Sequence, residues 1–110
     1  MKDIFKIKSM FPITRERVSI KPFRASDITN DYISWLNDRE VVKFSNRRFI
    51  NQNQETCEAF FNSIDSSDNI FLVVTHNENK ETLGTVTVYF YKNQQTADIG
   101  IMLGNKKYWG

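Results

Sequence analysis

The stretch that most constrains the fold is Thr96–Leu103, because its apolar side chains recur with a period of two residues. Apolar side chains occupy every second position, namely Ala97, Ile99, Ile101 and Leu103. A period of two residues is typical of a β-strand with one apolar face. Gly104 and Asn105 end this strand, and residues 106–110 are expected to enter a loop. The apolar face of such a strand must be covered by other elements of the chain.

Two further strands are expected directly before this one. Ile70–Thr75 reads IFLVVT, a continuous apolar run of the kind found in strands buried on both faces. Thr82–Tyr91 is a longer strand with Gly84 near its start, where glycine favours a β-bulge. Short polar turns at residues 76–80 and 92–95 join the three strands, which predicts an antiparallel meander.

The first part of the chain predicts one strand and a first helix. Arg17–Lys21 alternates apolar and polar residues, and Pro22 closes it. Ser26 is the expected N-cap of a helix that ends near Asn37. Its apolar face has helical spacing and consists of Ile28, Tyr32, Trp35 and Leu36.

A second helix is expected after a connecting segment, residues 38–49, which has room for one short helical turn. Asn51 or Asn53 is its expected N-cap. Its apolar face consists of Cys57, Phe60, Phe61 and Ile64. The order of strand, helix, helix and three-stranded meander predicts an α+β fold in which two helices cover one face of the sheet.

The composition limits the class of protein. A chain of 110 residues with 40% hydrophobic residues and nine Phe is long enough for one domain with a core. A net charge of +2 gives no argument for nucleic-acid binding. No apolar run approaches the roughly 18 residues of a membrane span, and no set of metal ligands is expected. The single cysteine, Cys57, is compatible with a reducing, cytoplasmic location.

Two motifs resemble the GNAT N-acetyltransferases, most closely the RimJ/RimL-like branch and its relatives that act on amino-sugar nucleotides. The first motif is ERVSIKPFRASDITNDYISWLNDREVVKF, and the second is ADIGIMLGNKKYWG at the end of the chain. The resemblance covers residues 14–110, with residues 1–13 as a leader. It implies the N-terminal half of a GNAT fold, truncated after the start of the cofactor loop.

The resemblance also implies a binding site for acetyl-CoA. In the family the pantetheine arm pairs with the central strand, and the matching positions here are Ile101, Met102 and Leu103. Trp109 and Gly110 match the start of the loop that binds the pyrophosphate. The remainder of that loop and the family's usual general acid do not lie within these 110 residues, so we expect the chain by itself to bind acetyl-CoA weakly or to be inactive. From the period alone, residues 101–103 also fit a plain core strand.

Asp98 is the one carboxylate of the last strand. The resemblance implies a catalytic role in which Asp98 accepts the proton of the acceptor amine, directly or through water. A primary amine is mostly ammonium at neutral pH and must lose a proton before it attacks a thioester. The alternative is an exposed, solvated carboxylate near the start of the strand.

Residues 43–49 read KFSNRRF, three cations interleaved with two aromatic rings. Arg47 and Arg48 can bind phosphate groups while Phe44 or Phe49 stacks on a ring, which predicts contacts to a nucleotide-linked amine. The alternative is a solvated loop whose aromatic rings pack into the core.

Two functions follow from these observations. The first is an N-acetyltransferase that transfers acetyl from acetyl-CoA to a primary amine, with an amino-sugar nucleotide as the preferred acceptor. The second is a non-catalytic α+β binding module without the cofactor loop. The exposed edge of the last strand predicts self-association, and neither a nucleic-acid nor a membrane partner is expected.

Overall fold

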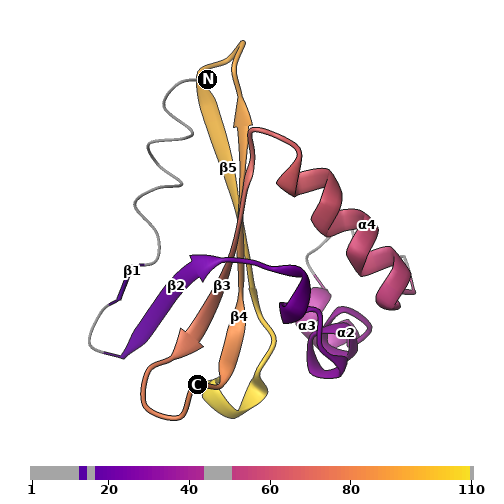
Figure 1. Ribbon diagram of the computed structural model, residues 1–110, viewed down its shortest axis with the longest axis vertical. Coiled ribbons are helices and arrows are strands. Elements are labelled where there is room, and N and C mark those ends of the chain that lie inside the picture. Colours follow the sequence, from indigo (N-terminus) through magenta and orange to yellow (C-terminus); the bar gives the residue numbers. More distant parts are fainter. Residues whose placement is uncertain (1–12, 15–16, 44–50, 110) are drawn as a thin grey trace.

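A computed structural model describes residues 13–14, 17–43 and 51–109, and it contains one antiparallel sheet with helices packed on one side (Figure 1). The strands are β1 (Ile13–Thr14), β2 (Val18–Pro22), β3 (Ile70–His76), β4 (Thr82–Tyr91) and β5 (Thr96–Leu103). The α-helices are α2 (Asn30–Leu36), α3 (Arg39–Val42) and α4 (Gln54–Asp65). Two 3₁₀ turns, η1 (Ala25–Asp27) and η3 (Lys106–Tyr108), complete the described elements.

The spatial order of the sheet follows the order of the sequence, β1-β2-β3-β4-β5. The predicted meander of β3, β4 and β5 is confirmed, and β4 and β5 have the predicted bounds. The predicted α+β architecture is therefore confirmed. β2 pairs with β3, and the two-residue β1, which the sequence did not predict, pairs with β2.

The expected β-bulge lies beside Gly84. The register shifts here, because Val74 pairs with Gly84 whereas the next residue of β3, Thr75, pairs with Thr82. Glycine is needed for a second reason: a Cβ atom at residue 84 would lie 1.9 Å from the carbonyl oxygen of Met102. The absence of a side chain therefore allows β5 to lie close against β4 at this point.

The predicted N-cap of the first helix is wrong. Ser26 lies in η1, where the Asp27 carboxylate accepts a hydrogen bond from the Arg24 backbone N–H at 2.8 Å. Thr29 caps α2, and its hydroxyl accepts from the backbone N–H of Tyr32 at 3.2 Å. Both residue types are good caps, and the local carboxylate turn moves the helix start by one turn.

The second helix begins at its predicted cap. The Asn53 side chain accepts from the Thr56 backbone N–H at 2.9 Å, and the Thr56 hydroxyl accepts from the Asn53 N–H at 2.8 Å. This reciprocal pair satisfies two backbone donors that the helix itself leaves unpaired. The short α3 occupies the segment in which one helical turn was expected.

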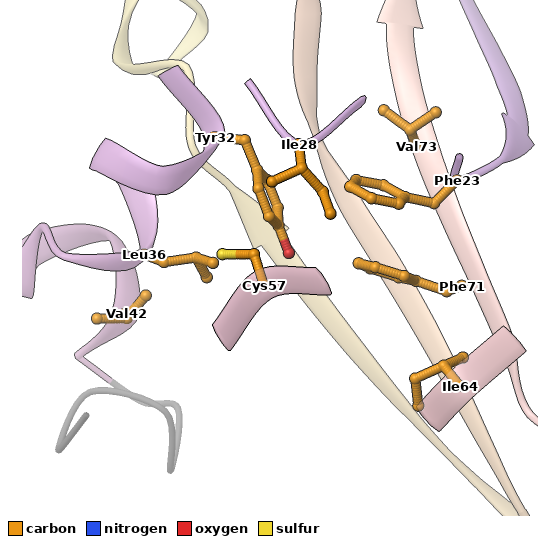
Figure 2. Close-up of a cluster of buried hydrophobic side chains, with 9 residues drawn as sticks. All are labelled: Phe23, Ile28, Tyr32, Leu36, Val42, Cys57, Ile64, Phe71 and Val73. Atoms are coloured by element: carbon orange, nitrogen blue, oxygen red, sulfur yellow. The ribbon is translucent and has the colours of Figure 1, made fainter. Parts of the chain in front are cut away.

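The main core lies between the helices and one face of the sheet. Figure 2 shows nine of its side chains, contributed by η1's flanks, the three helices and β3. The rings of Phe23 and Phe71 stack with centroids 4.2 Å apart, and Phe60 meets Phe71 edge-on at 5.4 Å. Val73 at the centre of β3 is 0% exposed. This packing fixes α2, α3 and α4 against the sheet and leaves the outer part of β5 beyond the core.

The opposite face of the sheet has a smaller apolar cluster. Ile70 and Leu72 are buried there, which confirms that the first half of β3 is buried on both faces. The side chains of Ile99 and Ile101 project on this face of β5 and are 66% and 76% exposed. Ile99 and Ile101 are thus the two most exposed of the large hydrophobic side chains among the described residues.

Candidate active site

A cleft of about 720 Å³ lies between the helices and the part of the sheet formed by β4 and β5. Its apolar lining comprises Leu36, Val41, Val42, Phe60, Phe71 and Met102, together with Ile99, Gly100 and Ile101 of β5. Its polar wall consists of Thr85, Thr87, Tyr89, Tyr91 and Asp98. A cleft with an apolar body and a few converging polar groups is the usual form of a small-molecule site.

The register of β4 and β5 places the polar groups on one face. Tyr89 is the cross-strand partner of Asp98, and Thr87 is the partner of Gly100. A Cβ atom at Gly100 would meet no heavy atom closer than the Thr87 carbonyl oxygen at 4.0 Å. Gly100 therefore leaves open space in the middle of β5, beside the only carboxylate of that strand.

Asp98 is exposed to solvent and lines the cleft. Its carboxylate raises the pKa of Tyr91, first through a hydrogen bond with the tyrosine hydroxyl and second through its negative charge. The two side chains belong to adjacent strands and lie together at the end of the cleft that carries the Asp98 carboxylate. This position suits a carboxylate that receives a proton from a bound amine, although the proposed catalytic role itself stays a prediction.

The backbone N–H and C=O groups of β5 point alternately toward β4 and toward the outer edge of the strand. The Gly104 N–H donates to the Leu83 carbonyl at 3.1 Å, and the Met102 carbonyl points at Gly84. In an antiparallel pair, the N–H and C=O groups of one residue both point to the partner strand, and those of the next residue both point away from it. The even-numbered residues of β5 therefore form the hydrogen bonds to β4. Ile101 and Leu103 consequently direct their N–H and C=O groups to the outer edge.

The three predicted cofactor contacts on β5 therefore differ from one another. Ile101 and Leu103 present backbone groups at the edge, where an extended amide chain can pair as a further strand would. Met102 directs its backbone to β4, and its side chain packs against the main core. The carbonyl of Leu103 already accepts a hydrogen bond from Trp109 Nε1 at 2.8 Å. Of these three residues, an extended ligand can thus pair with the N–H and C=O groups of Ile101 and with the N–H group of Leu103.

The segment after β5 is fixed on two sides. On one side, Lys106 Nζ lies 2.9 Å from Asp38 Oδ2 and 3.4 Å from Glu40 Oε2. On the other side, Glu81 accepts hydrogen bonds from Lys107 Nζ at 3.1 Å and from the Tyr108 hydroxyl at 2.9 Å. Trp109 follows this turn and is 36% exposed. Gly110 lies outside the described residues.

Gly104 joins β5 to this segment beneath the Trp35 ring. A Cβ atom at residue 104 would lie 2.2 Å from Trp35 Cδ2. The backbone therefore lies directly on the indole of α2, a contact that only glycine permits. Trp35 itself is partly buried against the main core.

Arg47, Arg48 and Phe49, the predicted contacts of the acceptor, lie outside the described residues. The flanks of that segment are joined by Asn37 and Gln52. The Asn37 side chain donates to the Gln52 carbonyl at 2.8 Å and accepts from its N–H at 2.7 Å. This double hydrogen bond brings together the chain before and after residues 44–50.

The sequence pattern did not single out Tyr91, Thr85 and Thr87 as parts of the site. The sequence does contain a signal for them, because Thr85, Thr87 and Tyr91 occupy alternate positions of β4 and must therefore lie on the same face of the sheet. The short turn between β4 and β5 sets the register that brings this face beside Asp98. Thr85 and Thr87 are only 6% and 9% exposed, so their hydroxyls lie at the inner wall of the cleft.

Neither a membrane helix nor a metal site is found in the described part of the chain. None of its helices is both long and apolar enough to cross a bilayer. Within residues 17–43 and 51–109, no three His, Cys, Asp or Glu side chains gather as metal ligands would.

Comparisons with known proteins agree with this architecture. Residues 17–110 match a family model described as the acetyltransferase (GNAT) domain. The chain therefore belongs to the GNAT acetyltransferase family, which implies acyl transfer in general terms. No curated protein matches the sequence.

A solved structure described as an acetyltransferase of the GNAT family from Bacillus anthracis is similar in fold. Its TM-score is 0.69 at 21% sequence identity, and the match covers 89% of this chain. The chain covers 55% of that structure, or about half of its length. The likeness confirms the predicted GNAT topology for the elements present.

Proposed function

We propose that this protein transfers the acetyl group of acetyl-CoA to a primary amine. The observation that carries the proposal is the position of Asp98, which lies in the cleft two residues before the open space at Gly100, on the same face of β5. The edge supplies backbone groups for an extended pantetheine arm, and the cleft supplies room for an acceptor. The family assignment supports acyl transfer of this kind.

In the reaction, the amine nitrogen forms a bond to the thioester carbonyl carbon, and the bond from that carbon to sulfur breaks, so that CoA leaves as a thiolate and takes up a proton from water. The proton lost by the amine goes to the Asp98 carboxylate, directly or through one water molecule. Tyr91 holds the carboxylate from the neighbouring strand. The Thr85 and Thr87 hydroxyls are hydrogen-bonding groups for the body of the acceptor, and the wall around Phe60 and Phe71 excludes water from it.

We further propose a nucleotide-linked amino sugar as the acceptor. The support for this choice is the sequence of residues 43–49, in which Arg47 and Arg48 can bind phosphates. The proposal predicts that Arg47→Ala or Arg48→Ala raises the Michaelis constant for this acceptor and leaves the constant for acetyl-CoA unchanged. Unaltered kinetics in both variants would leave the loop without a role in acceptor binding.

Binding of acetyl-CoA is the first test. Calorimetric titration should show binding that Ile101→Pro weakens, because proline removes an edge-facing N–H and its ring obstructs pairing. We expect weak affinity for the 110-residue chain. Micromolar affinity would show that residues 1–110 hold the cofactor without a complete pyrophosphate loop.

Transfer is the second test. Release of free thiol from acetyl-CoA is followed with a set of primary amines that includes nucleotide-linked amino sugars. Asp98→Asn should lower kcat by about 100- to 10,000-fold, the range of general-base catalysis. Asp65→Asn, at the exposed end of α4, is the matched control and should leave kcat unchanged. Cofactor binding with no transfer to any amine would instead support a non-catalytic binding module.

A further inference from the structure

Two threonine side chains in the cleft are buried without a hydrogen-bond partner. Thr85 and Thr87 are only 6% and 9% exposed, and both line the cleft. Neither hydroxyl forms a hydrogen bond with any of the described residues, whereas Thr29 and Thr56 use their hydroxyls in helix caps. A buried hydroxyl without a partner is unfavourable, so native structures usually keep one only where it binds water or a ligand.

The position of the two threonines does not depend on either edge of the sheet. Their strand, β4, is hydrogen-bonded to β3 on one side and to β5 on the other. Their cross-strand partners on β3 are Val73 for Thr85 and Phe71 for Thr87, and both of these residues are buried in the main core. The two hydroxyls therefore belong to the floor of the cleft, at a place fixed by paired strands.

The β5 side of this floor differs between the two threonines. Thr85 lies opposite Met102, whose side chain packs against the main core, and Thr87 lies opposite Gly100. A Cβ atom at Gly100 would meet no heavy atom closer than 4.0 Å, so the space beside Thr87 is open. On the same face, Asp98 is the diagonal neighbour of Thr87, which places their Cβ atoms about 7–8 Å apart. A ligand that fills this space can contact both side chains.

We infer that Thr87, assisted by Thr85, selects an acceptor that carries a hydroxyl group within a few bonds of its amine. The inference rests on the proposed transfer to a primary amine. A threonine hydroxyl both donates and accepts a hydrogen bond, and an alcohol group of the ligand does the same. The separation of Asp98 and Thr87 suits an amine and an alcohol that a few covalent bonds join. An amino sugar meets this requirement, and a simple alkylamine does not.

The rest of the cleft does not distinguish these two kinds of amine. Its apolar lining, which includes Leu36, Val42 and Phe60, can contact the carbon skeleton of either kind. Thr85 and Thr87 are the two buried residues of its polar wall. An amine without a hydroxyl would leave them unpaired after binding, and a site with unpaired buried polar groups discriminates against such a ligand.

Titration with two matched amines tests the inference. Vicinal aminocyclohexanol, in its cis and trans forms, differs from cyclohexylamine by one hydroxyl group. Binding to the 110-residue chain is followed by NMR chemical shifts without acetyl-CoA, with the Gly100 amide as the local reporter. One form of the amino alcohol should bind about tenfold more tightly than cyclohexylamine, the ratio that corresponds to one neutral hydrogen bond. Equal affinities, or no binding of either amine at millimolar concentration, would overturn the inference.

Three threonine variants assign the preference to a residue. Thr87→Val keeps the shape of the side chain without the hydroxyl, so it should remove the preference and leave the affinity for cyclohexylamine unchanged. Thr85→Val should have a smaller effect, because Met102 rather than a glycine lies opposite. Thr75→Val, in β3 and outside the cleft, is the matched control and should keep the preference. A preference that persists in Thr87→Val would contradict the assignment.

Unfolding of the free protein separates a role in binding from a role in stability. Since Thr87→Val removes no hydrogen bond within the described residues, its urea midpoint should equal or exceed that of the unmodified chain. A lower midpoint would show that the hydroxyl already stabilises the fold, and it would overturn the inference.

Transfer assays distinguish the failure of this inference from the failure of the proposed function. Preferred binding of the amino alcohol, without release of free thiol from acetyl-CoA, would contradict only the proposed function. Transfer to both amines with equal kcat/KM would contradict only the selection by Thr87.

Discussion

The Lys106 ammonium lies 2.9 Å from Asp38 Oδ2 and so joins the turn after β5 to the start of α3. Each of the two residues shifts the pKa of the other. The hydrogen bond from Lys106 is the largest cause that lowers the pKa of Asp38, and the bond to Asp38 is the largest cause that raises the pKa of Lys106. On the other side of the turn, Lys107 and then Tyr108 lower the pKa of Glu81.

The Asp38–Lys106 pair predicts a pH-dependent contribution to stability. Because the pKa of Asp38 is lower in the folded chain than its ordinary value of 3.8, the contribution is complete above that value. It is lost as the pH falls through the lowered pKa. A double-mutant cycle with Asp38→Asn and Lys106→Met, measured by urea unfolding, should give a favourable coupling at pH 6 that is weaker at pH 2. Equal coupling at both pH values would contradict this assignment.

Substitution by alanine should change the stability of the fold differently at Gly104 and at Gly100. Gly104→Ala should destabilise the fold by about 1–3 kcal/mol, the usual cost of overpacking, because the new methyl group overlaps the Trp35 ring. Gly100→Ala is the matched control and meets only open space. Urea midpoints compare the two variants, and Trp35→Leu should recover part of the loss in Gly104→Ala. Similar losses at both positions would show that the indole contact is not the cause.

Tyr91 should report on the charge of Asp98. Since the carboxylate raises the pKa of Tyr91, Asp98→Asn should lower the pH at which one of the four tyrosines ionises. The measurement is the ultraviolet absorbance of tyrosinate during alkaline titration. In a Tyr91→Phe background, Asp98→Asn should leave the titration curve of the remaining tyrosines unchanged, and a persistent shift would assign the effect to another ring.

Asn37 predicts a loss of stability that depends on both of its hydrogen bonds. Asn37→Ala removes the donor and the acceptor that bind the Gln52 backbone, and Gln52 is only 7% exposed. Leaving such groups unpaired costs about 1–3 kcal/mol. Asn62→Ala, on the exposed side of α4, is a matched control and should change stability little. Thermal unfolding compares the variants, and equal midpoints would show that water replaces the Asn37 side chain.

The strands of the meander could be predicted because their signal is local. The alternation in Thr96–Leu103 and the polar turns on either side of Thr82–Tyr91 determine both bounds of β4 and β5. The start of α4 followed for the same reason, since Asn53 and Thr56 cap the helix through side chains three residues apart. The start of α2 could not be predicted in this way, because Ser26 and Thr29 are both good N-cap residues. Which of them caps the helix depends on the turn that the Asp27 carboxylate forms.

The candidate site could be predicted only in part. Asp98 stood out as the one carboxylate of its strand, but its neighbour Tyr91 became visible only from the register of β4 and β5. The direction of the β5 backbone likewise depends on pairing, which is why Ile101 and Met102 looked equivalent in the sequence. The contact between Trp35 and Gly104 joins residues far apart in the chain and has no local signal.

The contact between Trp35 and Gly104 also has a consequence for the order in which the chain folds. β3, β4 and β5 are joined by short turns and can form as consecutive hairpins, whereas the Trp35 indole of α2 is covered only after β5, the last of the described strands, has formed. Pulse-labelled hydrogen exchange should therefore show amide protection in β4 before protection in α2, and the reverse order would show that the helices form first. During synthesis, a chain that ends before β5 therefore carries an incomplete helix layer. Its Trp35 side chain remains exposed to chaperones until β5 has been made.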